Sequence, residues 1–528
     1  MFIPLTPLRF LHRAVDLYPN KIGVICGGHE FTYSEFGQRC ERLAAGLVAE
    51  GVAPGDRVAY LSFNTHRLLE GYFGVPQARA VLCPLNVRLT VLELADLLNH
   101  SGASTLIFEE EFAPLVADFR MRCPALKLYI GADSSSAADL TYEELLQRAT
   151  PERADIFAYD ENSIAELFYT GGSTGKPKGV MLSHRTLYLH AMGAAVLSKD
   201  PETAVDLYTI PLFHANGWGH PHIAALLGIR QIMVRRFEPG QVLRLIERYG
   251  ATEMNLIPLM ARMILQVPDA QSFARGSMRD IHVGGAPCSP QLIARMERLF
   301  PNARCISGYG LTETSPFLSY PRPSKTEAES PEARHERVSA AGWPIVGARI
   351  RLVDSHRNDI PRDGVTVGEI IAQGDNVMDG YFGEPALTAA AIKNNWLHTG
   401  DLAVWDNDGT IRFVDRSKDL IVSGGENISS VEVENAIAHH PAVQECAVIG
   451  VPHQTWGEVP LAIVVLRPQQ TLAAEDLLAF LRPHLAGFKL PRRVEFSEEA
   501  LPRSATLKVK KMLLREKYWG GELDRVRG

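Results

Sequence analysis

The hydrophobic pattern alternates between two periodicities along most of the chain. Short apolar runs, such as Ile22–Cys26, Arg57–Leu61 and residues 104–108, are separated by longer stretches with apolar positions at helical spacing. Strand-like runs that alternate with amphipathic helical patterns are typical of α/β folds. The first three quarters of the chain are therefore predicted to be α/β. Residues 320–339 are polar and charged, which predicts a surface excursion.

The pattern changes near residue 405. Asn407-Asp408-Gly409 followed by an alternating run predicts a β-hairpin. Residues 429–432 have capping-box spacing and predict the start of a helix that continues through Ile437. Two strands, residues 445–451 and 461–466, and a helix capped by Thr471 with a leucine stripe to Leu485 are expected after it.

The length implies more than one domain, since 528 residues exceed what one compact core holds. We expect a large N-terminal domain with several subdomains of mixed sheets and helices, residues 1–417. A small C-terminal α/β domain is expected for residues 418–528.

Composition and charge exclude some classes of protein. Hydrophobic residues make up 46% and charged residues 22%, as in ordinary soluble proteins, and the net charge of −7 argues against a nucleic-acid partner. The seven cysteines are scattered and form no C-x-x-C pair, which predicts reduced thiols. The proline-broken N-terminus does not resemble a signal peptide, and no run reaches membrane-spanning length. A cytoplasmic protein is expected.

Residues 169–184, "YTGGSTGKPKGVMLSH", contain the strongest candidate for phosphate chemistry. A P-loop needs four residues between its first glycine and the Gly-Lys pair, followed by Ser or Thr. Gly171 and Gly175 enclose only three residues, and Pro177 follows Lys176, so the P-loop interpretation fails. The run can still offer backbone N–H groups, hydroxyls and Lys178 to phosphate oxygens. A solvent-exposed glycine turn is the alternative.

The run resembles the phosphate loop of the adenylate-forming (ANL) superfamily, which includes acyl-CoA synthetases, peptide-synthetase adenylation domains and luciferases. Other stretches similar to superfamily signatures follow in order: "GGAP" at 284–287, "GYGLTE" at 308–313, "TGD" at 399–401, and Arg416. The resemblance implies that ATP is bound by Thr170, Gly172, Ser173, Thr174, Gly175, Lys178, Gly285, Ala286, Pro287, Gly308, Tyr309, Gly310, Thr312, Asp401, Arg416 and Lys508.

The resemblance also implies individual roles, which fit the chemistry of the residue types. The ring of Tyr309 would lie on adenine, and Thr312 would contact the α-phosphate. Glu313, a hard oxygen donor, and Thr170 would hold Mg²⁺ shared with the polyphosphate. Asp401 and Arg416 would hold the ribose hydroxyls. Each short motif taken alone is also compatible with an ordinary turn.

The segment "LPRSATLKVKKMLLRE" resembles the catalytic-lysine segment of the superfamily and places Lys508 at the catalytic position. A solvated basic patch of Lys508, Lys510 and Lys511 is the alternative. Leu507 replaces the usual glycine, which costs about 1 kcal/mol if the backbone needs a positive φ. Gly171 likewise stands where Ser or Thr is common. The C-terminal domain is expected to be mobile, with a hinge near Lys418.

The run "PLFHANGWGHP" lies where acyl-CoA synthetases carry their acyl pocket. His214 and Trp218, with Gly284 and Gly310, are the expected pocket residues, and His214 is also assigned to the catalytic set. An ordinary core histidine is the alternative for His214.

The resemblance is strongest to the fatty-acid and medium-chain acyl-CoA ligase branch. It implies an AMP-forming ligase that uses ATP, Mg²⁺ and coenzyme A with a fatty, medium-chain or aryl carboxylic acid. An enzyme that loads a carrier protein and a catalytically impaired nucleotide-binding homologue are the alternatives. The sequence does not specify oligomeric state, and a homodimer is compatible with it.

Overall fold

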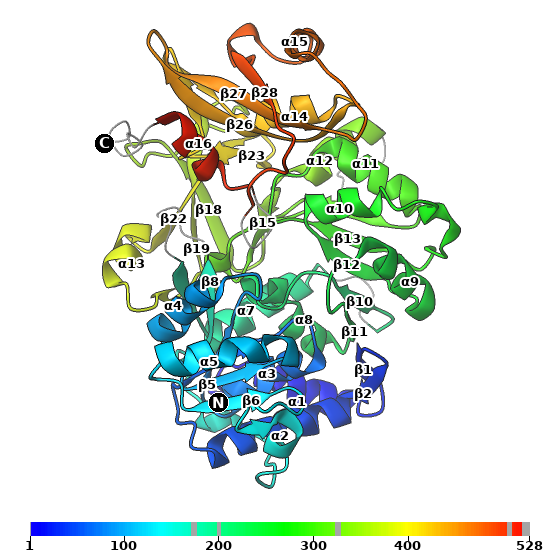
Figure 1. Cartoon of the computed structure of the whole chain (residues 1–528), viewed down its shortest axis with the longest axis vertical. Helices are drawn as coiled ribbons and strands as arrows, with labels where there is room; N and C mark the ends of the chain where they lie inside the picture. Colours follow the sequence, from blue (N-terminus) through cyan, green and yellow to red (C-terminus); the bar gives the residue numbers. More distant parts are fainter. Residues whose placement is uncertain (1, 171–176, 198–201, 323–328, 504–508, 520–528) are drawn as a thin grey trace. The chain divides into compact units, whose positions relative to one another are not determined.

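The computed structural model describes residues 2–170, 177–197, 202–322, 329–503 and 509–519 (Figure 1). The chain divides into two compact units, residues 1–350 with 372–397, and residues 351–371 with 398–528. The division passes through strands β18 (Ala348–Val353), β19 (Val367–Gly374) and β22 (Trp396–Trp405). Each unit mixes helices and strands, so the predicted α/β architecture is confirmed.

The first large sheet of unit 1 has the order β20-β9-β8-β4-β3-β5-β6-β7. Its strands are β3 (Arg57–Leu61), β4 (Val81–Pro84), β5 (Thr105–Phe108), β6 (Leu128–Gly131), β7 (Leu140–Thr141), β8 (Ile164–Thr170), β9 (Lys178–Ser183) and β20 (Gly380–Tyr381). Strands β3 to β6 pair in parallel, whereas β8 and β9 are antiparallel. One face packs on a core that includes Leu61, Leu97 and Phe108.

The second large sheet of unit 1 has the order β14-β13-β12-β10-β11-β1-β2. Its strands are β1 (Ile22–Cys26), β2 (His29–Thr32), β10 (Val205–Tyr208), β11 (Arg230–Met233), β12 (Glu253–Leu256), β13 (Asp280–Val283) and β14 (Arg304–Ser307). Strands β10, β12, β13 and β14 run parallel, so their carboxyl ends meet at one edge. Figure 1 shows helices α9, α10 and α11 beside this sheet.

The remaining strands of unit 1 form small sheets. Strands β15 (Tyr309–Gly310), β16 (Phe317–Tyr320) and β17 (Trp343–Pro344) pair in that order, and β21 (Ile392–Lys393) pairs with β22. The helices of this unit are α1 (Leu8–Leu17), α2 (Tyr33–Ala49), α3 (His66–Gln77), α4 (Val91–Ser101), α5 (Ala113–Arg122), α6 (Tyr142–Leu145), α7 (His184–Ala195), α8 (His220–Leu227), α9 (Pro239–Tyr249), α10 (Pro258–Ile264), α11 (Pro290–Leu299), α12 (Pro331–Ser339) and α13 (Pro385–Ala391).

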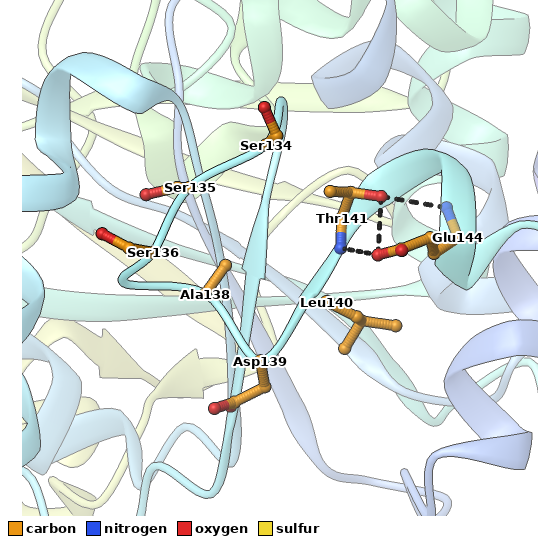
Figure 2. A pocket seen from close by; sticks show the side chains of 8 residues that line it. All are labelled: Ser134, Ser135, Ser136, Ala138, Asp139, Leu140, Thr141 and Glu144. Atoms are coloured by element: carbon orange, nitrogen blue, oxygen red, sulfur yellow. Dashed lines mark hydrogen bonds between the residues drawn. The ribbon is translucent and has the colours of Figure 1, made fainter.

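Several helices of unit 1 begin where the sequence supplies an N-cap. Helix α6 is a short example: Thr141 accepts a hydrogen bond from the Glu144 amide, and the Glu144 carboxylate accepts one from the Thr141 amide at 2.7 Å (Figure 2). Helices α2 and α4 carry the same reciprocal pair at Thr32 and Thr90.

One sheet of unit 2 has the order β25-β24-β27-β26, with β28 paired to β27, and is built on the long antiparallel pair β26 (Val443–His453) and β27 (Gly457–Leu466). Strand β23 belongs to another sheet, where it pairs with β22. The other elements are β23 (Ile411–Arg416), β24 (Ile421–Ser423), β25 (Glu426–Ile428), β28 (Arg493–Phe496), α14 (Ser430–Ala438), α15 (Ala474–Leu481) and α16 (Lys511–Trp519). Ser429 caps α14 by accepting from the Glu432 amide, as the capping-box spacing predicts. Trp405 pairs with Ile411, so the predicted hairpin is confirmed.

Two local predictions differ from the structure. Helix α15 begins after Ala473 rather than at a Thr471 cap, because the acidic residues Glu475 and Asp476 form its first turn. The predicted surface excursion at 320–339 contains helix α12, capped by Ser330, which buries Val338. All seven cysteines lie in the described part of the chain and are free thiols. None of the described helices combines the length and apolar character needed to cross a membrane.

Candidate active site

The predicted phosphate loop joins two antiparallel strands of unit 1. Strand β8 ends at Thr170 and β9 begins at Lys178, and these two residues are direct partners across the ladder. Gly172, Ser173, Thr174 and Gly175 lie outside the described residues. The strand pair therefore delivers one predicted hydroxyl and one predicted ammonium group to the base of the loop.

A tyrosine connects the predicted phosphate lysine with the predicted metal ligand. The Lys178 ammonium lies 4.9 Å from the centre of the Tyr381 ring. The Tyr381 hydroxyl donates a 2.9 Å hydrogen bond to Oε1 of Glu313. Burial and the adjacent Glu313 carboxylate raise the pKa of Tyr381, so the phenol keeps its proton and acts as a donor. The structure thus brings Lys178 and Glu313 together around Tyr381.

Sequence reasoning missed Tyr381. It lies on β20, whose pairing with β9 at Val180 places it near Lys178. The amide of Met378 also donates to the Glu313 carbonyl at 2.9 Å, which fixes the backbone of the short helical turn at residues 312–314. A Gly-Tyr pair between Asp379 and Phe382 carries no local signal of this role, because the contact arises from strand pairing.

The two glycine-containing motifs follow the carboxyl ends of adjacent parallel strands. Gly284 directly follows β13, and Gly308 directly follows β14. Gly285 has a φ of +73°, which favours glycine, and Gly285, Ala286 and Pro287 are exposed. Ligands of open α/β sheets bind at such carboxyl ends. These exposed backbone groups are therefore accessible to a nucleotide.

Gly310 occupies a position that excludes every other residue. A Cβ atom built on Gly310 would lie 1.7 Å from the carbonyl oxygen of Pro316. This close approach holds β15 against β16, where Tyr309 pairs with Ser319. Tyr309 is half-buried and Thr312 is buried. The glycine thereby fixes the backbone on both sides of the residues predicted to contact adenine and the α-phosphate.

The predicted acyl-pocket run forms an unusual turn before α8. Ala215, Asn216, Gly217, Trp218 and Gly219 all have positive φ values, between 43° and 74°. Left-handed backbone in consecutive non-glycine residues costs free energy and is concentrated at functional sites. The turn is stabilised by a 3.2 Å hydrogen bond from the Asn216 amide group to the Ser315 carbonyl.

The left-handed turn places Trp218 against the predicted adenine turn. A Cβ atom built on Gly284 would lie 3.1 Å from Cη2 of Trp218, and one on Gly285 would lie 3.4 Å from its Cζ2. The indole also packs edge-to-face on Phe317, with ring centres 6.1 Å apart. Trp218 is buried, and His214 at the start of the turn is half-buried. Trp218 and Gly284, both predicted pocket residues, are thus in contact.

A buried polar pair anchors the helix that follows Trp218. Nδ1 of His220, the first residue of α8, lies 2.6 Å from Oδ2 of Asp206 on β10. Burial alone would lower the pKa of His220, but the Asp206 carboxylate outweighs it and raises the pKa. Neither residue was singled out from the sequence, because partners 14 positions apart give no local pattern.

The predicted ribose-binding residues are paired within unit 2. Asp401 on β22 and Arg416 on β23 are direct partners in the ladder, with Nε of Arg416 3.4 Å from Oδ1 of Asp401. Asp401 is buried, which leaves Arg416 as the more accessible member. Thr399 donates to the Ile370 carbonyl at 2.7 Å and accepts from the Asp401 amide, so the Thr-Gly-Asp turn is fixed.

The hinge and catalytic-lysine predictions concern the remainder of unit 2. Lys418 is exposed, and its carbonyl accepts a 2.7 Å hydrogen bond from Arg515 on α16. Lys508 and Leu507 lie outside the described residues. Lys511, which the basic-patch alternative placed in solvent, instead forms a 2.7 Å ion pair with Glu434 and is largely buried.

The site offers one protein carboxylate for a magnesium ion. Mg²⁺ in nucleotide sites is usually held by one or two carboxylates together with substrate phosphates. Glu313 is half-buried, and its hydrogen bond to Tyr381 uses Oε1. Among the described residues, no three His, Cys, Asp or Glu side chains gather as a complete metal site. The donor set fits a metal ion shared with a polyphosphate.

Two surface hollows of the structure contain none of the predicted site residues. One, of about 360 Å³, is lined by three consecutive serines and by residues around Thr141 (Figure 2). The other, of about 470 Å³, has a mixed lining of four apolar and four polar or charged residues: Leu265, Val267, Asp269, Ala270, Gln271, Arg295, Arg298 and Leu299.

The chain matches the model of the AMP-binding enzyme family over residues 11–382, and the model of the AMP-binding enzyme C-terminal domain over residues 432–508. It is 38% identical to the long-chain-fatty-acid–CoA ligase of Thermus thermophilus, covering 96% of this chain and 95% of the relative. It is also 38% identical to a feruloyl-CoA synthase of Amycolatopsis, covering 96% and 98%.

Solved structures with the same fold include ATP-bound MatB from Rhodopseudomonas palustris, with a TM-score of 0.85 and 28% identity over 97% of this chain and 99% of that one. The anthranilate CoA ligase AuaEII in complex with anthranoyl-AMP has a TM-score of 0.88 and 24% identity, with 98% of both chains covered.

Proposed function

The chain belongs to the family of AMP-binding enzymes, and from this premise we propose that it is an AMP-forming acyl-CoA synthetase for a fatty or aryl carboxylic acid. The predicted adenylate-forming family, α/β fold and acid–thiol ligase class are confirmed. The arrangement of Lys178, Tyr381 and Glu313 carries the proposal, since it places a cation, a hydrogen-bond donor and a carboxylate around one point.

In the first half-reaction, the carboxylate of the acid attacks the α-phosphorus of ATP, giving acyl-AMP and pyrophosphate. Such transfers need positioning and charge neutralisation more than covalent help from the protein. Lys178 supplies positive charge to the departing pyrophosphate. Glu313 and Thr170 would hold magnesium, which would neutralise phosphate charge. The ribose is held by Asp401 and Arg416.

We assign to Lys508 the main charge-neutralising role in this half-reaction. Its ammonium bridges the carboxylate oxygen and the α-phosphate as negative charge develops. In the second half-reaction the CoA thiol attacks the acyl carbon and AMP leaves. The hinge at Lys418 lets the small domain, residues 418–528, change its position between the two steps.

The acid is bound beside Trp218 on this proposal. Two relatives with the same 38% identity are named for long-chain fatty acids and for ferulate, so identity does not choose between aliphatic and aromatic acids. The buried indole against Gly284 supports a pocket with an aromatic wall, which suits either a hydrocarbon chain or a ring. His214 would orient the carboxylate.

A panel of acids tests the proposed activity. Acetate, butyrate, octanoate, palmitate, benzoate and ferulate are each incubated with the protein, ATP, Mg²⁺ and CoA, and AMP and acyl-CoA are measured. At least one acid is expected to give both products in equal amounts. AMP and thioester formed only with a holo-carrier protein would instead establish the carrier-loading alternative. Failure of every acid to promote pyrophosphate exchange into ATP would contradict any adenylating function.

Lys508→Ala tests the assignment of the catalytic lysine. Acid-dependent AMP formation is expected to fall by at least roughly 100-fold, because the charge at the α-phosphate is lost. Thioester formation from preformed acyl-AMP is expected to stay largely intact. Equal loss of both half-reactions would show that the assigned role is wrong.

A further inference from the structure

A buried polar cluster in unit 2 joins three elements of the chain. Nζ of Lys511, the first residue of α16, donates a 2.6 Å hydrogen bond to Oγ of Ser430 and lies 2.7 Å from Oε1 of Glu434 on α14. Ser430 in turn donates through both its amide and its hydroxyl to Oδ2 of Asp415 on β23, each at 2.6 Å. We call Asp415, Ser430, Glu434 and Lys511 the α16 anchor.

The α16 anchor has the properties of a fixed ionic network. Ser430 and Asp415 are 0% and 2% exposed, and the Lys511 side chain is 13% exposed. Burial alone would lower the pKa of Lys511, but Glu434 and Asp415 outweigh it and raise the pKa, so the ammonium stays charged. Oε1 of Glu434 also accepts from the Val448 amide at 2.8 Å. Buried networks whose members are hydrogen-bonded hold their elements in one arrangement.

Two residues of the α16 anchor are close in sequence to residues with predicted roles in binding or catalysis. Lys511 follows Lys508 by three residues, and Asp415 directly precedes Arg416, which pairs with Asp401. Helix α16 also contacts the backbone at the predicted hinge. Its Arg515 donates to the Lys418 carbonyl at 2.7 Å and to the Asp419 carboxylate at 3.0 Å.

The described residues on both sides of residues 504–508 are held by further contacts. Arg503 and Val509 form an antiparallel bridge, and the Lys510 amide donates to the Pro502 carbonyl at 2.7 Å. On the preceding side, Arg503 pairs with Glu445, and the Leu501 amide donates to the same carboxylate at 3.0 Å. On the C-terminal side of Lys508, the first charged side chain that is largely buried and paired is that of Lys511.

We propose that Lys511 is a positioning residue for adenylation: it fixes the start of α16, three residues after Lys508, to the strand that carries the ribose-binding Arg416. The inference rests on the proposed function, because it needs Lys508 to act at the α-phosphate. A 1 Å misplacement of a catalytic group can lower a rate by roughly 100-fold, so a remote anchor can control one chemical step.

The test compares Lys511→Met with Lys511→Arg, Glu434→Gln and a matched control, Lys510→Met. Lys510 is the adjacent lysine and is exposed. For Lys511→Met we expect a fall in kcat for acid-dependent AMP formation of at least roughly 10-fold, with KM for ATP within about 3-fold. Thioester formation from preformed acyl-AMP is expected to change by less than about 3-fold. Lys511→Arg should restore most of the adenylation rate, and Lys510→Met should match the wild type.

Glu434→Gln keeps the test decisive if Lys511→Met does not fold, because the substitution keeps the size of the side chain and removes only the charge. It should lower adenylation more than thioester formation. Adding it to Lys511→Met should have little further effect, since both remove one interaction. Equal loss of the two half-reactions together with a lower thermal midpoint would overturn the inference in favour of a structural role.

The result for the wild type separates the inference from the proposed function. A wild-type protein that adenylates an acid, with a Lys511→Met variant that adenylates it equally fast, would refute the inference alone. A wild-type protein that forms no AMP with any acid would refute the proposed function, and the inference with it.

Discussion

At the scale of single residues, Tyr381 is the group that links the predicted phosphate and metal contacts. Its hydroxyl donates to Glu313 while its ring faces the Lys178 ammonium. The raised pKa of Tyr381, caused by burial and by Glu313, keeps the donor protonated at physiological pH. The hydrogen bond holds the Glu313 carboxylate in one orientation, as the proposed magnesium ion would require.

Tyr381→Phe isolates the contribution of that hydrogen bond. The ring below Lys178 remains, and only the donor to Glu313 is lost. Because hydrogen bonds to charged groups contribute about 1.5 to 3 kcal/mol, adenylation should slow by roughly 10- to 100-fold. The dependence of the rate on Mg²⁺ concentration should shift to higher concentrations. Tyr159→Phe, which removes a buried hydroxyl that donates to the Gln77 carbonyl, is the matched control. Equal effects of both variants would contradict the role.

The sequence predicted Glu313 and Lys178 but not Tyr381, for a physical reason. Glu313 and Lys178 lie in runs whose residue types and spacing resemble signatures of a superfamily. Tyr381 is 68 positions from Glu313 and reaches it through the pairing of β20 with β9. Contacts made by long-range strand pairing leave no local pattern, so a sequence without relatives cannot specify them.

At the scale of elements, the left-handed turn before α8 determines where Trp218 lies. Positive φ values from Ala215 to Gly219 direct the indole towards Gly284 and Phe317. A sequence with two glycines in "ANGWG" permits such a turn but does not dictate it, because asparagine and tryptophan also adopt ordinary helical backbone. The side chain was predicted, whereas the conformation that places it was not.

Trp218→Ala tests whether the turn borders the acid. Removal of the indole leaves space beside Gly284, so bulkier acids should gain relative to smaller ones. One methylene in an apolar pocket changes selectivity by about 1 to 3 kcal/mol. The ratio of kcat/KM for a bulkier acid to kcat/KM for a smaller acid should therefore rise by roughly 10-fold or more. The measurement is kcat/KM across the acid panel, with the thermal midpoint recorded for each variant. An unchanged ratio would place the acid elsewhere.

The parallel sheet of unit 1 contains a row of carboxylates with a consequence for stability. Glu253 on β12 lies opposite Asp206 on β10 and Asp280 on β13. Burial first, and then the adjacent Asp206, raise the pKa of Glu253 from 4.5 to about 7, although His220 and Arg304 oppose the shift. The folded state therefore favours the protonated form. The stabilisation is present at low pH and is lost as the pH rises through 7.

Glu253→Gln tests this dependence, because glutamine cannot ionise. As the pH rises from 5.5 to 8.5, the free energy of unfolding of the variant minus that of the wild type should increase, by at most about 3 kcal/mol. Thermal midpoints at the two pH values provide the measurement. Glu332→Gln, which changes an exposed carboxylate on α12, should give the same difference from wild type at both pH values. A constant difference for Glu253→Gln would show that the carboxyl titrates as in the unfolded chain.

At the scale of the whole molecule, the predicted order of strands and helices agrees with the structure where patterns are strong. Strands β1 and β3 have the predicted bounds because their apolar runs are continuous and buried. Helix α12 was missed because its nine residues bury only Val338, which gives no apolar stripe. The family was recognisable because its short motifs occur in one order along nearly the entire chain. The family models match residues 11–382 and 432–508, and residues 399–401 and Arg416 lie between the two matches.

The two half-reactions require different arrangements of the chain if the hinge proposal at Lys418 holds. Lys418→Pro tests it, because proline fixes φ near −65° and so restricts the backbone at that one residue. One half-reaction should slow by roughly 10-fold or more relative to the other, since an arrangement that needs a different φ at residue 418 becomes inaccessible. Adenylation and thioester formation are measured separately, the second from preformed acyl-AMP.

Lys418→Ala is the matched control, because it removes the same ammonium group without restricting the backbone. It should leave the ratio of the two rates close to that of the wild type. Both substitutions retain the backbone carbonyl of residue 418, which accepts from Arg515 in the wild type, so this attachment of α16 is expected to remain. A difference between proline and alanine therefore reports on backbone rotation at residue 418, and an identical ratio in the two variants would locate the hinge at another residue.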